Sequence, residues 1–280
     1  MKFSININAP KEKVWRVLFD DLTYRQWTTP FHEGSYAEGT WEKGSHIHFL
    51  GPDGRGMYGI IEENIENEYM AIRQIGELSD FKEIPVDEKA SKWAGSMETY
   101  RLIPQEDSTE LIIELGGDDY NTPDEMSKAF YPAMDIIKKL SESPVKITIS
   151  TTVNNTIENV WKHWTAPEHI MQWTFASDDW HSPSATNDLK PGGEFTTRME
   201  AKDGSFGFDF GGKYTSINEE KHITYDMSDG RQVEIDFTPE ADGIKVTETF
   251  DAENQNSYDM QKFGWQSIMD NFKKYSESNK

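Results

Sequence analysis

The sequence contains no cysteine. This absence excludes disulfides, zinc sites with thiolate ligands and catalysis by a cysteine nucleophile. It leaves the cellular compartment open, because only a disulfide framework would indicate an oxidising one. The chain also lacks an apolar run of the about 20 residues that a membrane span requires, and its first residues, MKFSININAPKEK, lack the apolar stretch of a signal peptide. We therefore expect a cytoplasmic protein.

Basic residues are scarce. The 280 residues include 28 Lys and Arg against 50 Asp and Glu, which gives a formal net charge of −22. Such a chain repels a phosphate backbone and an anionic bilayer, so we expect neither nucleic acid nor membrane among its partners. The simpler interpretation of the acidity is solubility, and the alternative is a specific basic partner.

Aromatic residues, by contrast, are plentiful, and several recur at a long fixed spacing. The helix predicted for residues 260–277 carries one apolar stripe at i, i+3, i+4 and i+7, formed by Trp265, Ile268, Met269 and Phe272. The same spacing occurs 135 residues earlier, at Phe130, Ala133, Met134 and Ile137. Trp15 and Trp161 differ by 146 residues, as do Trp27 and Trp173. A period this long indicates two tandem domains rather than a solenoid.

Each long helix follows a series of apolar–polar alternations that predict β-strands. The predicted strands are 3–8, 45–50, 56–62, 69–75, 97–103 and 110–115, then 146–153, 194–201, 207–217, 222–227, 232–238 and 244–250. Residues 76–95 are expected to form a long polar connection, where the second half has only the Asp229-Gly230 turn. Ser141–Pro144 is typical of a linker, so we place the domains at residues 1–142 and 144–280.

Several motifs of the second half resemble those of a known family. They are Thr156-Ile157-Glu158-Asn159-Val160-Trp161, Trp164-Thr165-Ala166-Pro167-Glu168, Trp173, Leu189-Lys190-Pro191-Gly192-Gly193-Glu194-Phe195 and Gly264-Trp265. Together they resemble the family related to activators of the heat shock protein 90 ATPase, within the START-like (SRPBCC) superfamily. The first half looks like a diverged copy, with Ala129-Phe130 in place of Gly264-Trp265 and no Pro-Gly-Gly turn.

The resemblance implies an α+β fold made of two tandem helix-grip (START/Bet v-like) domains. In each, a curved antiparallel sheet would wrap around a long C-terminal helix, two short helices would close one end, and an apolar cavity would lie between sheet and helix. The residues agree with this expectation, since strands with one apolar face need a cover and each half supplies one long helix.

Eight side chains of the second half are candidates to line a ligand-binding cavity. They are Trp164, Trp173, Trp180, His181, Phe208, Tyr225, Trp265 and Met269. The alternative is a solid core in which the large apolar members of this set touch one another, since burial is their ordinary state. For His181, the alternative is an ordinary loop histidine.

Glu248 is the one candidate acid or base. In the run 244–250 it shares a strand face with Ile244, Val246 and Phe250, so strict alternation points its carboxyl inward. Burial would raise its pKa and suit it to proton transfer. The alternatives are a bulge that turns Glu248 to solvent, or a partner such as Arg198.

We expect neither metal nor cofactor. His46 and His48 lie two residues apart on one strand face, but the sequence shows no third ligand near them, and zinc needs three or four. Gly192-Gly193 precedes a strand rather than a helix, so it is not a nucleotide-binding loop. No Gly-x-Ser-x-Gly elbow is present.

Three functions therefore remain as hypotheses. The leading one is non-catalytic binding of a small hydrophobic or amphipathic molecule in the second domain. The second is a co-chaperone-like module that stimulates a chaperone ATPase, which the resemblance suggests, although we expect no separate N-terminal chaperone-binding domain. The third is an enzyme of the cyclase or hydrolase kind that uses the inward carboxyl of Glu248. A small apolar ligand and a chaperone are thus the candidate partners.

Overall fold

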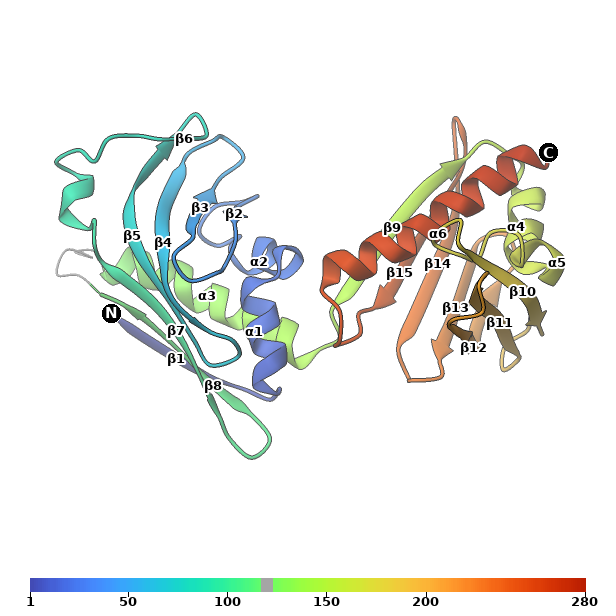
Figure 1. Ribbon diagram of the computed structural model, residues 1–280, viewed down its shortest axis with the longest axis horizontal. Coiled ribbons are helices and arrows are strands. Elements are labelled where there is room, and N and C mark those ends of the chain that lie inside the picture. Colours follow the sequence, from blue (N-terminus) through green and yellow to red (C-terminus); the bar gives the residue numbers. More distant parts are fainter. Residues whose placement is uncertain (117–122) are drawn as a thin grey trace. The chain divides into compact units, whose positions relative to one another are not determined.

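Alternating strands followed by one long helix occur in both halves of the chain, as the sequence predicts (Figure 1). The computed structural model describes residues 1–116 and 123–280. The chain divides into two compact units, Met1–Pro144 and Val145–Lys280. Each unit contains one antiparallel sheet and one long C-terminal helix, so the fold class is α+β with tandem helix-grip architecture.

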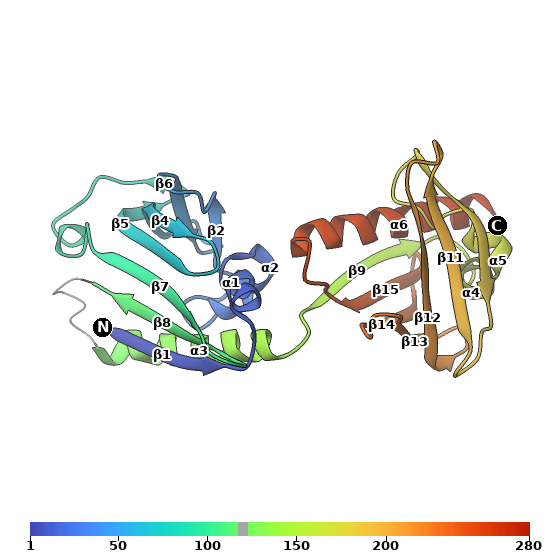
Figure 2. The same cartoon turned by 60° about the horizontal axis from the view of Figure 1, so that its bottom comes forward.

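The first unit has its sheet strands in the order β1-β8-β7-β5-β4-β3-β2, with β6 beside β5. Its strands are β1 (Lys2–Ile7), β2 (Tyr36–Gly39), β3 (His46–Leu50), β4 (Gly56–Ile65), β5 (Tyr69–Ser79), β6 (Lys82–Glu83), β7 (Met97–Pro104) and β8 (Thr109–Leu115). Its helices are α1 (Lys11–Phe19), α2 (Asp21–Trp27), the short 3-10 helix η1 (Ala90–Lys92) and α3 (Pro123–Glu142). Figure 2 shows α3 running alongside β1 and β8.

The second unit has seven strands in the order β10-β11-β12-β13-β14-β15-β9. These are β9 (Lys146–Val153), β10 (Trp180–Asn187), β11 (Glu194–Ala201), β12 (Gly207–Asn218), β13 (His222–Met227), β14 (Gln232–Glu240) and β15 (Gly243–Asp251). Its helices are α4 (Ile157–Thr165), α5 (Pro167–Ile170) and α6 (Tyr258–Ser278). All strand pairs in both sheets are antiparallel.

Four details differ from the sequence prediction. The prediction that residues 76–95 form only a polar connection is wrong. In the structure β5 continues to Ser79, and β6 and η1 lie within that range. The edge strands β2 and β10 were not predicted. The sequence predicts that Pro132 kinks the long helix of the first half or sets its start later, but α3 begins at Pro123 and contains Pro132 in its interior. Phe206 precedes β12 and is 62% exposed, so the apolar face that its alternation with Phe208 and Phe210 predicts does not include it.

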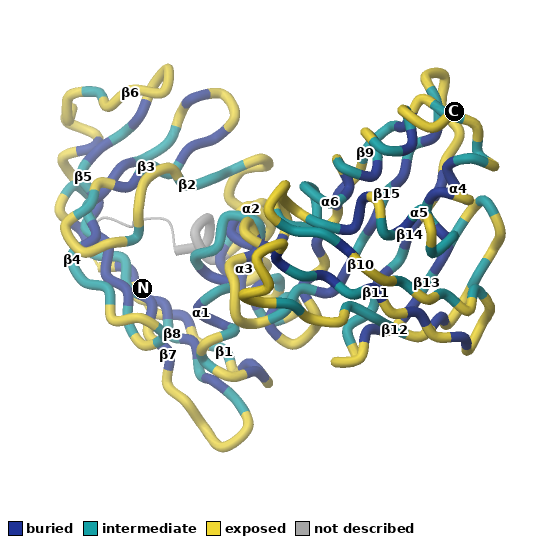
Figure 3. The backbone as a smooth tube through the Cα atoms, turned by 45° about the vertical axis from the view of Figure 1, so that its right-hand side comes forward, coloured by how far each residue is buried: buried dark blue, intermediate teal, exposed yellow. Residues whose placement is uncertain are grey.

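The core of each unit lies between its sheet and its long helix. Figure 3 shows exposed residues gathered in the turns, for example between β7 and β8, while buried residues follow the strands. In the first unit, Phe3 of β1 stacks on Phe130 of α3 with ring centroids 4.8 Å apart. In the second, Phe250 of β15 stacks on Trp265 of α6 at 3.9 Å. These stacks fix each helix against its sheet.

The short helices of the second unit are tied to the far end of α6. Thr156 caps α4 by accepting a hydrogen bond from the backbone N–H of Asn159. His163 Nδ1 and Ser276 Oγ, both in buried residues, share a hydrogen bond of 3.0 Å. His169 Nδ1 and the hydroxyl of Tyr275 share another of 2.6 Å. This end of the unit is therefore closed by packing and hydrogen bonds.

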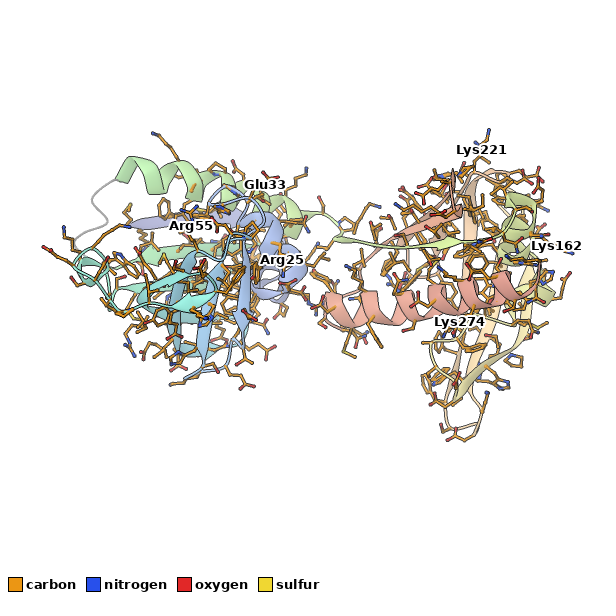
Figure 4. All side chains as sticks on the ribbon, turned by 90° about the horizontal axis from the view of Figure 1, so that it is seen from above. Arg25, Glu33, Arg55, Lys162, Lys221 and Lys274 are labelled. Carbon is orange, nitrogen blue, oxygen red and sulfur yellow. The ribbon has the colours of Figure 1, made fainter. Side chains whose placement is uncertain are left out.

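Within the described part of the chain, none of the helices combines the length and apolar character that crossing a bilayer requires. The basic side chains Lys162, Lys221 and Lys274 of the second unit are exposed and stand at its surface (Figure 4).

Candidate functional site

The second unit encloses a cavity of about 440 Å³ between α6 and its sheet. Eight aromatic side chains line it: Trp164, Trp173, Phe195, Phe208, Phe210, Tyr214, Tyr225 and Trp265. Helix α6 contributes one continuous face through Met260, Gln261, Gly264, Trp265, Ile268 and Met269. The volume lies within the range of roughly 300–1,000 Å³ that small-molecule sites occupy. The lining side chains thus surround a space instead of filling it.

The structure brings six of the eight predicted lining residues together around this cavity. They are Trp164, Trp173, Phe208, Tyr225, Trp265 and Met269. Trp180 and His181 are not among the described residues that line it. The ring of Trp180 packs beside Phe206 and Phe208 on the sheet edge. His181 Nε2 lies 3.2 Å from a carboxylate oxygen of Glu200, so both residues belong to the edge strand β10 and not to the interior.

Glu248 points into the cavity from β15. Its strand pairs with β14 and β9 in unbroken register, opposite Ile235 and Ile149, so there is no bulge to turn it outward. The residue is only 7% exposed, and it lines the cavity. The alternative partner, Arg198, instead forms ion pairs with Glu200 of β11 and Asp209 of β12. Within the described residues, no group forms a hydrogen bond or ion pair with the Glu248 carboxyl.

Burial without a partner changes the protonation of Glu248. Loss of solvation raises its pKa to about 8. At pH 7 this position therefore holds mainly the neutral carboxylic acid. Burial also raises the pKa of the neighbouring Tyr225, and the charge of Glu248 adds to that shift. The neutral acid is a hydrogen-bond donor and acceptor within an otherwise apolar wall.

The buried acid of the first unit, Glu98, differs from Glu248 because it has hydrogen-bond partners. Burial raises the pKa of Glu98 on β7, but its carboxylate accepts hydrogen bonds from the Tyr100 hydroxyl and from Gln74 Nε2. By the spacing of 135 residues, the position that corresponds to Glu248 is Ile113 of β8. Ile113 pairs with Phe3 and Tyr100, as Glu248 pairs with Ile149 and Ile235. An unpartnered acid at this position is therefore particular to the second unit.

The start of α6 supplies a polar rim to the cavity. Gln261 Nε2 donates to the backbone oxygens of Glu253 and Asn256, at 3.1 and 2.9 Å, and its Oε1 accepts from the Glu253 N–H. Arg231, which also lines the cavity, pairs with Asp229 through Nε at 2.8 Å. These contacts hold the loop before α6 in place, so the polar rim of the cavity is preorganised for ligand binding.

The histidine pair of the first unit has a neighbour that the sequence does not reveal. His48 Nε2 lies 3.0 Å and His46 Nδ1 3.6 Å from the same oxygen of Glu83 on β6. The prediction that no carboxylate lies near them is therefore wrong, because Glu83 is 35 residues from His48 in sequence and reaches it through the short strand β6. Among the residues that the structure describes, no three His, Asp or Glu side chains are placed to hold a metal ion.

Comparison with known proteins gives a family match over most of the chain. The family described as activator of Hsp90 ATPase homolog 1-like protein matches twice, at residues 8–142 and 154–277. No curated protein matches the chain.

Solved structures resemble the chain as follows. The AHSA1-like protein from Aeromonas hydrophila is 44% identical over 48% of this chain and 93% of its own, with a TM-score of 0.46. A protein from Cytophaga hutchinsonii is 51% identical over the same shares, with a TM-score of 0.43. A di-domain ARO/CYC protein from the steffimycin biosynthetic pathway is 13% identical over 99% of this chain and 98% of its own, with a TM-score of 0.36.

Proposed function

The chain belongs to the family of activator of Hsp90 ATPase homolog 1-like proteins, and from this premise we propose that its second unit binds a small, neutral hydrophobic or amphipathic molecule in the cavity beneath α6. One observation carries the proposal: an aromatic-lined space of about 440 Å³ contains a buried carboxyl that no protein group satisfies. Leaving a buried polar group without a partner is costly. A ligand with one hydrogen-bonding group would remove that cost.

The protonation of Glu248 defines the polarity of the ligand. An apolar molecule that displaces water from the cavity makes ionisation of the carboxyl still less favourable. A carbonyl, ether or hydroxyl oxygen on the ligand accepts a hydrogen bond from the neutral acid. The aromatic walls bury the rest of the molecule, with a gain of roughly 25 cal/mol per Å² of apolar surface. The favoured ligand is therefore neutral, mostly apolar and equipped with one acceptor.

A neutral dye tests this proposal. The probe is 6-propionyl-2-dimethylaminonaphthalene, a neutral naphthalene dye whose carbonyl oxygen can accept a hydrogen bond. We expect it to bind the intact protein saturably, with increased fluorescence, at neutral pH. Because binding favours the protonated acid, affinity should fall by up to about tenfold per pH unit above the pKa of about 8 that Glu248 has in the empty cavity. The dye carries no charge over this range, so the titration of Glu248 is expected to dominate the change. Fluorescence titrations from pH 6 to 10 measure it.

The Glu248→Gln variant is the matched control, because glutamine keeps the shape and cannot ionise. It should bind the dye with an affinity that does not change between those pH values. A wild-type protein that shows no saturable binding, and no competition from extracted lipids or aromatic compounds, would contradict the proposed function. Binding that remains unchanged at alkaline pH would contradict the role assigned to Glu248.

Catalysis by Glu248 is the second candidate, and the raised pKa is the observation that favours it. General acids and bases work best when their pKa lies near the working pH. In such an enzyme of the cyclase or hydrolase kind, the carboxyl would exchange a proton with a substrate held by the aromatic walls. For any substrate found through the dye competition, Glu248→Gln should lower turnover by roughly 10²–10⁴-fold while dye binding persists. Equal turnover by the variant would exclude this role.

A chaperone partner is the third candidate, and only the family description supports it. An ATPase assay of the cognate chaperone with the full chain in excess tests it. Stimulation is the expected result if the chain acts as a co-chaperone, and an unchanged rate removes the candidate.

A further inference from the structure

Gly264 occupies an unusual place in the second unit. It lies in the interior of α6, six residues after the helix begins at Tyr258, and it lines the cavity. Apart from the adjacent residues and the backbone of its own helix, a Cβ built on Gly264 would meet no described atom within 4 Å. Glycines that a fold requires for close packing behave differently: at Gly56, for example, a Cβ would come within 1.9 Å of a backbone oxygen. No protein atom in contact range therefore excludes a side chain at position 264.

This glycine also weakens the helix that carries it. In a helix interior, glycine is less favourable than alanine by roughly 1 kcal/mol, because the unfolded chain loses more freedom on folding. The first unit shows that the fold accepts alanine here, since Ala129 occupies the corresponding position of α3, directly before Phe130. Neither backbone conformation nor packing explains why the second unit keeps glycine.

The helix residues on either side of Gly264 define the space beside it. Met260 and Ile268 lie one helical turn before and after it, and all three line the cavity. The missing side chain thus leaves a gap in this row, at which the helix backbone faces the cavity. Glu248 belongs to the same cavity but comes from the sheet and not from the helix. The cavity therefore has a polar group on its sheet side and an unoccupied contact position on its helix side.

We propose that Gly264 is a specificity-determining ligand contact: the apolar part of the bound molecule lies directly against the α6 backbone between Met260 and Ile268. This inference rests on the proposed function of the cavity. Glycine is the residue that permits such a close approach of backbone and ligand. The arrangement favours a flat ring system over a branched chain, because the gap is only one side chain wide.

The Gly264→Ala variant separates this role from a structural one. The substitution should raise the unfolding midpoint of the second unit by roughly 3–6 °C, since alanine favours the helix and meets no atom. The same variant should bind 6-propionyl-2-dimethylaminonaphthalene roughly tenfold more weakly, because the new methyl group occupies the space of the ligand. Greater stability together with lost affinity is the signature of a ligand contact. Thermal unfolding and fluorescence titration of the full chain measure the two quantities.

Ser267→Ala is the matched control on the same helix. Ser267 is not among the described residues that line the cavity, and its hydroxyl donates to the Phe263 backbone oxygen, so this variant should leave the affinity unchanged. Dye binding by Gly264→Ala that equals the wild-type value would overturn the inference and leave the proposed function intact. A wild-type protein that does not bind the dye at all would overturn both.

Discussion

Replacing Glu248 with glutamine should make the second unit more stable than the wild type at pH 8.5, by up to about 5 kcal/mol. In the folded unit burial raises the pKa of Glu248 to about 8, whereas the ordinary value is 4.5. An acid with a raised pKa in the folded state contributes stability that is fully present below pH 4.5 and is lost as the pH rises to 8. Each pH unit corresponds to about 1.4 kcal/mol, and water entering the cavity reduces the total.

Hydrogen exchange measures this pH-dependent change in stability separately in each of the two units. Peptides from β15 and α6 report the opening of the second unit, and peptides from β8 and α3 report the first. We expect wild-type protection in β15 to fall between pH 5 and 8.5, after correction for the intrinsic exchange rate, and Glu248→Gln to show a much smaller change. Glu234→Gln is the control, because this carboxylate of β14 is 40% exposed beside Lys146. A Glu248→Gln profile that matches the wild type would show that Glu248 ionises freely.

Truncating Phe272 to alanine should cost about 3–5 kcal/mol of stability in the second unit. Phe272 is completely buried in α6, and its ring meets those of Trp164 and Trp173 at 4.7 and 5.0 Å between centroids. Removing it leaves a hole at the closed end of the unit, where α4 and α5 meet the helix. Chemical denaturation followed by circular dichroism measures the change.

The same helix provides a control for that measurement. Phe263 lies nine residues earlier and is 75% exposed, so Phe263→Ala should change stability by no more than about 0.5 kcal/mol. If the two variants proved equally stable, α6 would not be held by its buried stripe, and the helix-grip description of the second unit would be wrong.

The features that the sequence predicts correctly are those that follow from a regular spacing of apolar residues. The stripe from Trp265 to Phe272 predicts a helix at 260–277, and α6 spans Tyr258–Ser278. Alternation along residues 244–250 predicts that the Glu248 side chain points inward, and the register of β15 places it there. Both features depend on local periodicity, which a sequence displays directly.

Local periodicity does not reveal edge strands or contacts between residues that are far apart in the sequence. The strand β10 has the sequence WHSPSATN, with Pro183 inside it and no apolar alternation, because an edge strand packs on one side only. The sequence consequently predicts that Trp180 and His181 line the cavity, whereas both lie on this edge strand. Glu83 reaches His48 only through the pairing of β6 with β5. The cavity itself depends on the volume left between side chains, and Gly264 matters only because no side chain fills that volume.

A constant offset of 135 residues links the two units from β7 and β14 onward, so each position of these elements has a counterpart in the other unit. The first unit then serves as an internal control for the second. Its counterpart of Glu248 is Ile113, which is completely buried and pairs with Phe3 and Tyr100, and its counterpart of Gly264 is Ala129. One polypeptide thus contains one unit with the buried acid and the helix gap at these positions and one unit with neither.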